Sequence, residues 1–91
     1  VDAGAAAALA RGKSLLPAGV VSVSGRFERG DLVLVKDQEG RVLARGLSAY
    51  DSTEAGRIIG LRSSMIEQVL GYRGREELVH RNDLAMVNEH G

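Results

Sequence analysis

The sequence predicts one small, mostly β domain: a barrel of about six strands flanked by about three short helices. The strongest observation is a hairpin pattern over residues 30–46, GDLVLVKDQEGRVLARG, in which two apolar runs flank a polar turn. Further short apolar runs are separated by turn residues, and three short segments carry helix start and stop signals. With 91 residues and no repeat, long linker or low-complexity tract, the chain fits one domain over residues 1–91.

The first expected element is a helix over residues 3–11. This run is rich in alanine, which has the highest helix propensity, and Asp2 before it is a favoured N-cap. Gly12 follows, as expected for a residue that ends a helix in the left-handed conformation. Arg11 lies where its charge suits the helix C-terminus.

A loop and a strand are expected next. Residues 13–19 predict a loop or a short edge strand that ends at Pro17, the only proline. In residues 20–25 apolar and polar residues alternate from Val21 onward. This alternation predicts a half-exposed strand with Val21 and Val23 facing inward.

The hairpin itself has a short, β-branched first run over residues 32–35, which predicts a strand buried on both faces. Residues 42–44 supply the returning strand. Between the two runs, the side chain of Asp37 can accept hydrogen bonds from nearby backbone amides. Gly40 can take the positive φ that closes a four-residue turn over residues 37–40.

Two short helices are expected in the second half of the chain, over residues 52–59 and 63–70. Asp51 or Ser52 can cap the first, and a serine stands at the start of the second. Glycines follow both segments, at positions 60 and 71, and they favour helix ends there.

The C-terminal part predicts two more strands, over residues 77–80 and 84–87, with a turn over residues 81–83 between them. Tyr50 and Tyr72 are expected to pack their rings between the helices and the barrel. Their hydroxyl groups are expected to stay in contact with water.

Composition limits the classes of function. Twelve Lys and Arg balance twelve Asp and Glu, so the whole chain offers no electrostatic attraction toward phosphates. One Phe, two Tyr and no Trp leave few side chains on which unpaired bases could stack. With no Cys there is neither a disulfide framework nor a thiolate metal site, so a cytoplasmic location is expected, and no segment predicts a membrane span.

No motif for catalysis, cofactor binding or metal binding is present: the sequence holds no phosphate-binding glycine loop, no dinucleotide fingerprint and no zinc motif. A metal site at His80 or His90 would need carboxylate partners from elsewhere in the chain. We expect His80 to bond a neighbouring backbone group instead. Because Val1 opens the chain without Met and Asp2 directly begins a helical pattern, we expect a piece of a longer polypeptide.

Arg11 and Lys13 are the sharpest binding candidates in the sequence. Neighbouring glycines would let a phosphate backbone approach the peptide amides while the cations neutralise it. The alternative is a solvated helix end, which we favour because an isolated pair of cations adds only a modest phosphate contribution. Arg26 and Arg29 flank Phe27, but carboxylates interrupt them, so a surface ion-pair cluster is expected. Arg73 and Arg75 lie in a loop of similarly mixed charge.

Several motifs together resemble a known family. They are GKSLLPAGV at residues 12–20, VSGRF at 23–27, ARG at 44–46, LGY at 70–72 and VHR at 79–81. In this order and spacing they resemble the C-terminal PUA domains of bacterial glutamate 5-kinases, over nearly the whole chain. PUA domains, named for pseudouridine synthases and archaeosine transglycosylases, have a mixed β-pseudobarrel flanked by short helices. The resemblance therefore implies the fold class that the residues predict.

The resemblance implies a non-catalytic module of a larger enzyme. Glutamate 5-kinases phosphorylate L-glutamate with ATP and Mg²⁺ in the first step of proline biosynthesis and are inhibited by proline. Those sites belong to an N-terminal amino-acid kinase domain, which would be this module's partner in the same chain. We expect a regulatory or structural role, with an aliphatic face docked on the kinase domain, no membrane contact and a homo-oligomeric parent enzyme.

The resemblance also implies an alternative from a different class, RNA binding. PUA domains of RNA-modifying enzymes grip structured RNA through the first helix, the glycine-containing loop after it and a terminal strand. In this sequence Gly12, Lys13 and Gly19 match that loop, and Arg11 adjoins it. Cations gathered beside an open glycine loop would favour RNA, whereas interleaved carboxylates would favour protein docking.

Overall fold

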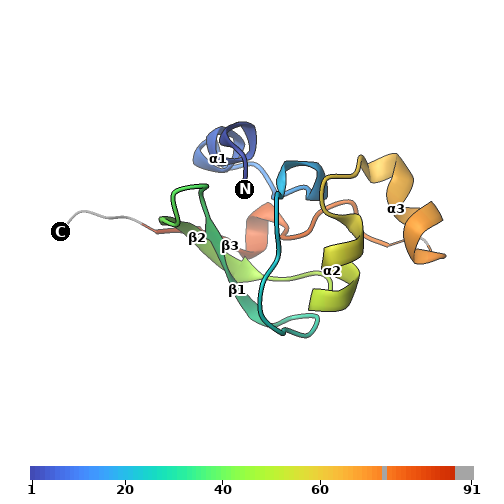
Figure 1. Ribbon diagram of the computed structural model, residues 1–91. Coiled ribbons are helices and arrows are strands. Elements are labelled where there is room, and N and C mark those ends of the chain that lie inside the picture. The colour runs from blue at the N-terminus through green and yellow to red at the C-terminus, as the bar shows by residue number, and fades with distance from the viewer. Residues whose placement is uncertain (73, 88–91) are drawn as a thin grey trace.

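The fold consists of three short helices and a three-stranded antiparallel sheet in residues 1–72 and 74–87, the part of the chain that the computed structural model describes. The order of elements, with η for a 3-10 turn, is α1 (Ala3–Ala10), η1 (Pro17–Gly19), β1 (Leu32–Lys36), β2 (Val42–Leu47), α2 (Ser52–Ile58), α3 (Ser63–Leu70), η2 (Arg81–Asp83) and β3 (Leu84–Met86). β2 is the central strand. In Figure 1, α1 lies beside the tip of the β1–β2 hairpin, and α2 and α3 lie toward the opposite end of the molecule.

The three predicted helices are confirmed, and side chains cap two of them. The Asp2 carboxylate accepts a hydrogen bond from the Ala5 amide at 2.7 Å, and Gly12 after α1 has a φ of 79°. Asp51, and not Ser52, caps α2 in a capping box with Glu54. The N-cap of α3 is Arg62, whose side chain makes no capping bond. Local sequence signals were therefore sufficient for the helices.

The predicted turn of the hairpin is also confirmed. The Gly40 amide donates to the Asp37 carbonyl at 3.0 Å, and Gly40 has a φ of 85°. The Asp37 carboxylate accepts from the amides of Glu39 and Arg41, each at 2.9 Å. These bonds explain why the pKa of Asp37 is lowered, the amide of Arg41 being the largest cause.

The prediction that β1 is buried on both faces is wrong. Val35 is buried, but Leu32 and Leu34 are 61% and 56% exposed. β1 belongs to an antiparallel sheet that packs against the core with one face only, and such sheets commonly leave the other face in solvent. An uninterrupted apolar run could not reveal this, because the outward residues are as apolar as the inward ones.

Two expected strands, and the possible edge strand over residues 13–19, do not form, so the described residues contain three strands and an isolated bridge instead of about six strands. Residues 20–25 are extended but belong to no ladder, and Val21 faces solvent with 57% exposure. Within residues 77–80 only Val79 pairs, in a bridge to Leu15. Pro17 has no N–H group with which to extend that bridge, and η1 begins there. The described part of the domain thus contains less β structure than the sequence predicts. The predicted turn over residues 81–83 and the last predicted strand are confirmed, as η2 and β3.

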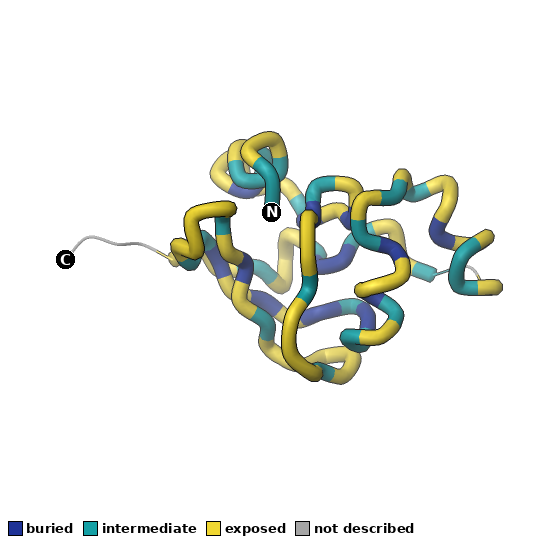
Figure 2. Tube along the Cα trace, viewed as in Figure 1, coloured by how far each residue is buried: buried dark blue, intermediate teal, exposed yellow. Residues whose placement is uncertain are grey.

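The core lies between the inner face of the sheet and the helices, where Figure 2 shows the buried residues. Its members are Leu9, Leu15, Val20, Val35, Ala44, Tyr50, Ala55, Ile58, Ile66, Leu78 and Val79. The expectation for the two tyrosine hydroxyls is wrong at Tyr50, because Tyr50 is 2% exposed and its hydroxyl donates to the Arg75 carbonyl at 2.5 Å. Tyr72 lies at the surface instead of packing its ring inside.

Candidate functional site

The first candidate site is the turn that follows α1. Arg11, Gly12 and Lys13 are exposed, and a Cβ added at Gly12 would meet no atom within 4 Å. However, the amides of Arg11, Gly12 and Lys13 all donate to carbonyls of Ala8 or Leu9, at 2.9 to 3.1 Å. A phosphate at this turn would therefore meet side-chain cations and not free backbone N–H groups.

The structure adds a third cation to this turn. The Arg81 amide donates to the Ser14 hydroxyl at 2.8 Å, and the Leu15–Val79 bridge holds the two segments together beside this bond. The side chain of Arg81 is exposed. Sequence reasoning missed this residue, because 67 positions separate Arg81 from Ser14 and no local signal marks a contact over that distance.

We call Arg11, Lys13 and Arg81 the α1 basic cluster. Every ion pair that the structure gives for the described residues lies elsewhere, at Arg29 or Arg41. Within the described residues, none of these three cations therefore forms an ion pair. Three cations suffice for a weak, salt-sensitive phosphate contact.

Gly19 does not belong to this cluster. Its carbonyl accepts from the Asp2 amide at 2.9 Å, which places it at the start of α1, the opposite end of the helix from Arg11 and Lys13. A Cβ at Gly19 would come within 2.5 Å of the Ala5 Cβ. Gly19 thus permits close packing of η1 against α1, and the structure does not bring it to the other predicted contact residues.

A second polar site forms where Arg29, Glu54 and Tyr72 meet. The Arg29 Nε donates to Glu54 Oε1 at 2.9 Å, the Tyr72 hydroxyl contacts the same carboxylate, and the guanidinium lies 5.6 Å from the centroid of the Tyr72 ring. The hydrogen bond from Arg29 lowers the pKa of Glu54 to about 2 and raises the pKa of Arg29, and the bond to Glu54 raises the pKa of Tyr72. The expected ion pair is thus present at Arg29, but its partner is 25 residues away.

We predict that this ion pair makes stability depend on acidity. Because the folded pKa of Glu54 is lowered from 4.5 to about 2, its contribution is present above pH 4.5 and is lost as the pH falls toward about 2. Arg29→Met is expected to raise the pKa of Glu54 toward its usual value in an NMR titration of the side-chain carboxyl. Arg26→Met, which removes an exposed arginine outside the described ion pairs, serves as the control. An unchanged Glu54 titration in Arg29→Met would contradict the assignment.

His80 makes the local contact expected of it. Its Nδ1 accepts from the Asn82 amide at 3.1 Å, at the start of η2.

Among residues 1–72 and 74–87, no three His, Cys, Asp or Glu side chains are grouped so as to hold a metal ion. No helix in the same residues is long and apolar enough to cross a bilayer. Arg73 and His90 lie outside the described residues.

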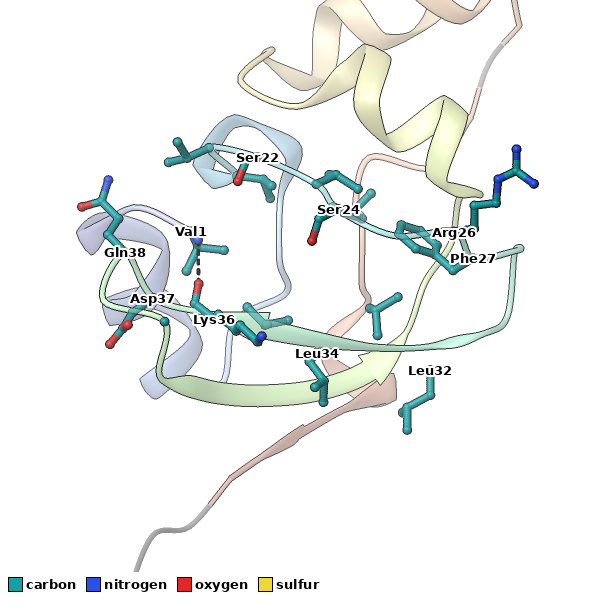
Figure 3. A pocket seen from close by; sticks show the side chains of 17 residues that line it. Val1, Ser22, Ser24, Arg26, Phe27, Leu32, Leu34, Lys36, Asp37 and Gln38 are labelled. Carbon is teal, nitrogen blue, oxygen red and sulfur yellow. Dashed lines mark hydrogen bonds between the residues drawn. The ribbon is translucent and has the colours of Figure 1, made fainter.

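An open groove of about 690 Å³ lies along the free edge of β1 (Figure 3). The extended segment of residues 20–27 forms its other wall, and none of the predicted contact residues lines it. At one end of the groove the Val1 nitrogen donates to the Lys36 carbonyl at 2.7 Å.

Comparison with known families identifies the class. The family model of the PUA domain matches residues 1–70, and the chain belongs to this family. A PUA domain protein from Aeropyrum pernix K1, solved as a tartrate complex, is similar in structure with a TM-score of 0.65 and 32% identity, covering 89% of this chain and 39% of that one. A PUA domain protein from Thermoplasma acidophilum shares the fold, with a TM-score of 0.55 and 21% identity over 100% of this chain and 47% of that one.

Within this family the chain is similar to glutamate 5-kinases. It is 62% identical over 86 residues to the enzyme of Paramagnetospirillum magneticum, which is 94% of this chain and 23% of that protein. It is 57% identical over 91 residues to the enzyme of Allorhizobium ampelinum, which is 100% of this chain and 23% of that protein. The chain therefore spans about a quarter of the length of these relatives.

Proposed function

We propose that this chain is the non-catalytic, C-terminal PUA module of a glutamate 5-kinase. The observation that carries the proposal is identity of 57 to 62% to these enzymes over nearly the whole chain, while the chain makes up 23% of their length. The reaction, transfer of a phosphoryl group from ATP to L-glutamate with Mg²⁺, then belongs to an N-terminal kinase domain of the same polypeptide. The full enzyme is a homo-oligomer that acts in proline biosynthesis in the cytoplasm.

The module's role in this proposal is regulatory or structural. A domain without catalytic residues alters the behaviour of an attached enzyme only through contacts that differ between the enzyme's conformational states. Contacts of that kind shift metal dependence, proline inhibition or assembly. They do not supply a catalytic group.

We predict that an enzyme truncated before Val1 still phosphorylates glutamate but responds differently to its effectors. The expected result is a several-fold shift in the Mg²⁺ or proline concentration giving half effect, or a changed oligomeric state, each measured beside the full-length enzyme. Kinetics, proline inhibition and sedimentation that all match the full-length enzyme would contradict the regulatory and structural role. Absence of glutamate phosphorylation by the full-length enzyme would contradict the parent assignment itself.

The second candidate function is RNA binding, and the Ser14–Arg81 bond favours it by adding a cation beside Arg11 and Lys13. Binding through this cluster predicts that fluorescence anisotropy with a structured RNA detects an affinity that weakens with salt. Lys13→Glu is expected to weaken binding to all sequences and to lower the slope of log affinity against log salt by about 1. Lys36→Glu, which reverses an exposed lysine outside the cluster, is the control. No binding near physiological salt would exclude this candidate.

A further inference from the structure

The extended segment along the groove leaves its backbone unpaired. From Val21 to Ser24, no N–H or C=O group takes part in a backbone–backbone hydrogen bond within residues 1–72 and 74–87. Backbone donors and acceptors are normally paired, in secondary structure, with side chains or with water. This segment therefore presents a row of donors and acceptors that a neighbouring strand could pair.

The edge of β1 that faces this segment is unpaired as well. The Ser48 amide donates to the Asp31 carbonyl at 2.9 Å, and antiparallel partners exchange such bonds at alternate residues. Leu32 and Leu34 therefore direct their N–H and C=O groups away from β2. The Lys36 carbonyl, two residues beyond Leu34, has the same direction, since it accepts its bond inside the groove.

β1 also lacks the usual protection of an edge strand. Such strands commonly carry charged residues or proline, which discourage pairing with another chain, but residues 32–35 are Leu and Val throughout. The side chains of Val23, Val33, Val35 and Leu78 line the groove and make it apolar beside this edge. The groove thus combines an apolar lining with unpaired backbone on both walls.

An extended polypeptide is the ligand whose chemistry matches such a groove. Its backbone offers donors and acceptors on both edges, and its side chains alternate between the two faces of the strand. The volume of about 690 Å³ lies in the range of ligand sites. β1 has five residues, so the ladder it offers is about 13 Å long.

Charge defines the ligand further. Arg26, Lys36 and Asp37 are the charged side chains that line the groove. The Asp37 carboxylate is already bonded to Arg41, whereas Arg26 and Lys36 belong to none of the ion pairs in the described residues. Figure 3 shows these two cations toward opposite ends of the groove. A peptide with an apolar centre and a carboxylate at each end would complement both.

We propose that the groove binds an extended segment of another protein, apolar at its centre and acidic at its ends, as an added strand between β1 and residues 21–24. The added strand pairs with the N–H and C=O groups of Leu32 and Leu34. In this mode of recognition main-chain bonds give affinity, and pockets for alternate side chains give specificity. The interaction adds a partner to the module and does not depend on which enzyme domain precedes it.

Fluorescence anisotropy with the full-length protein and a labelled acetyl-EVTVTVE-amide peptide tests this proposal. We expect saturable binding at micromolar concentrations. A peptide of the same sequence that is N-methylated at every second residue keeps its side chains but loses the amides for one wall, so it should bind many-fold more weakly. Equal binding of the two peptides would overturn strand addition. Absence of binding would overturn the proposal too, including the case in which a segment of the same polypeptide already fills the groove.

A charge reversal tests the ends of the site. Lys36→Glu is expected to weaken binding of the acidic peptide several-fold and to strengthen binding of acetyl-KVTVTVK-amide. Lys13→Glu, which reverses an exposed lysine outside the groove, is the matched control and should change neither affinity. Equal effects of the two substitutions would show a general response to net charge and would contradict the proposed site.

Amide hydrogen exchange of the complex distinguishes strand addition from contact through side chains alone. If the peptide pairs with β1, exchange slows several-fold in residues 32–36 and in residues 21–24, because unpaired amides become hydrogen-bonded. Exchange in α2, away from the groove, stays unchanged. Binding that leaves exchange in residues 32–36 unchanged would overturn the assignment of β1 as the pairing edge.

Discussion

Gly46→Ala is expected to lower the free energy of unfolding by about 3 kcal/mol, near the upper end of the usual cost of overpacking. Gly46 lies in β2 where the segment of Val79 and η2 crosses it. An added Cβ would approach the Asp83 carbonyl oxygen to 2.5 Å and the Val79 Cγ1 to 2.7 Å. The Asp83 carbonyl cannot yield without a shift of η2 and β3. The loss is measured by urea unfolding, with an unchanged m-value showing that the compactness of the two states is unaffected.

Gly56→Ala is the matched control for this prediction. Gly56 lies in α2, is exposed, and a Cβ there meets no atom within 4 Å. The same change is therefore expected to stabilise the domain by about 0.5 to 1 kcal/mol, the helix-propensity difference between glycine and alanine. If both variants had the same effect, Gly46 would not be held in close packing against η2.

Helix and turn signals were readable from the sequence because they act between near neighbours. Asp2 and Asp51 bond amides three residues away, and Asp37 bonds amides two and four residues away. Strand predictions depended on distant partners. Residues 20–25 have the alternation of a strand, but no neighbouring strand pairs with them, and alternation carries no information about pairing.

The candidate site at the turn after α1 was likewise predictable only where its residues are close together in the sequence. Arg11, Gly12 and Lys13 are adjacent in sequence, and the structure places them together in an exposed turn. Arg81 comes to that turn through a contact across 67 residues. Gly19 shows a second limit of sequence analysis. A glycine that leaves the backbone accessible at the surface and a glycine that permits close packing cannot be distinguished in the sequence. Only the 2.5 Å approach to the Ala5 Cβ distinguishes Gly19 from Gly12.

Tyr50→Ala is expected to cost about 3 to 5 kcal/mol, the range for truncating a large buried aromatic residue. Tyr50 is 2% exposed, and its ring lies so close to Gly74 that a Cβ there would approach the ring carbons to about 3 Å. The truncation would leave a cavity between the core and the segment of residues 74–75. Urea unfolding of the purified variants measures the loss.

Tyr50→Phe separates the contribution of the buried ring from that of the hydroxyl hydrogen bond. It keeps the ring and removes the hydroxyl that donates to the Arg75 carbonyl, so a loss of about 1 to 2 kcal/mol is expected. Tyr72→Phe is the control, because Tyr72 is 39% exposed and its hydroxyl contacts a surface ion pair, where contributions rarely exceed about 1 kcal/mol. A Tyr50→Phe variant no less stable than Tyr72→Phe would show that water replaces the bond to Arg75. The tyrosine would then anchor the segment of residues 74–75 through ring packing alone.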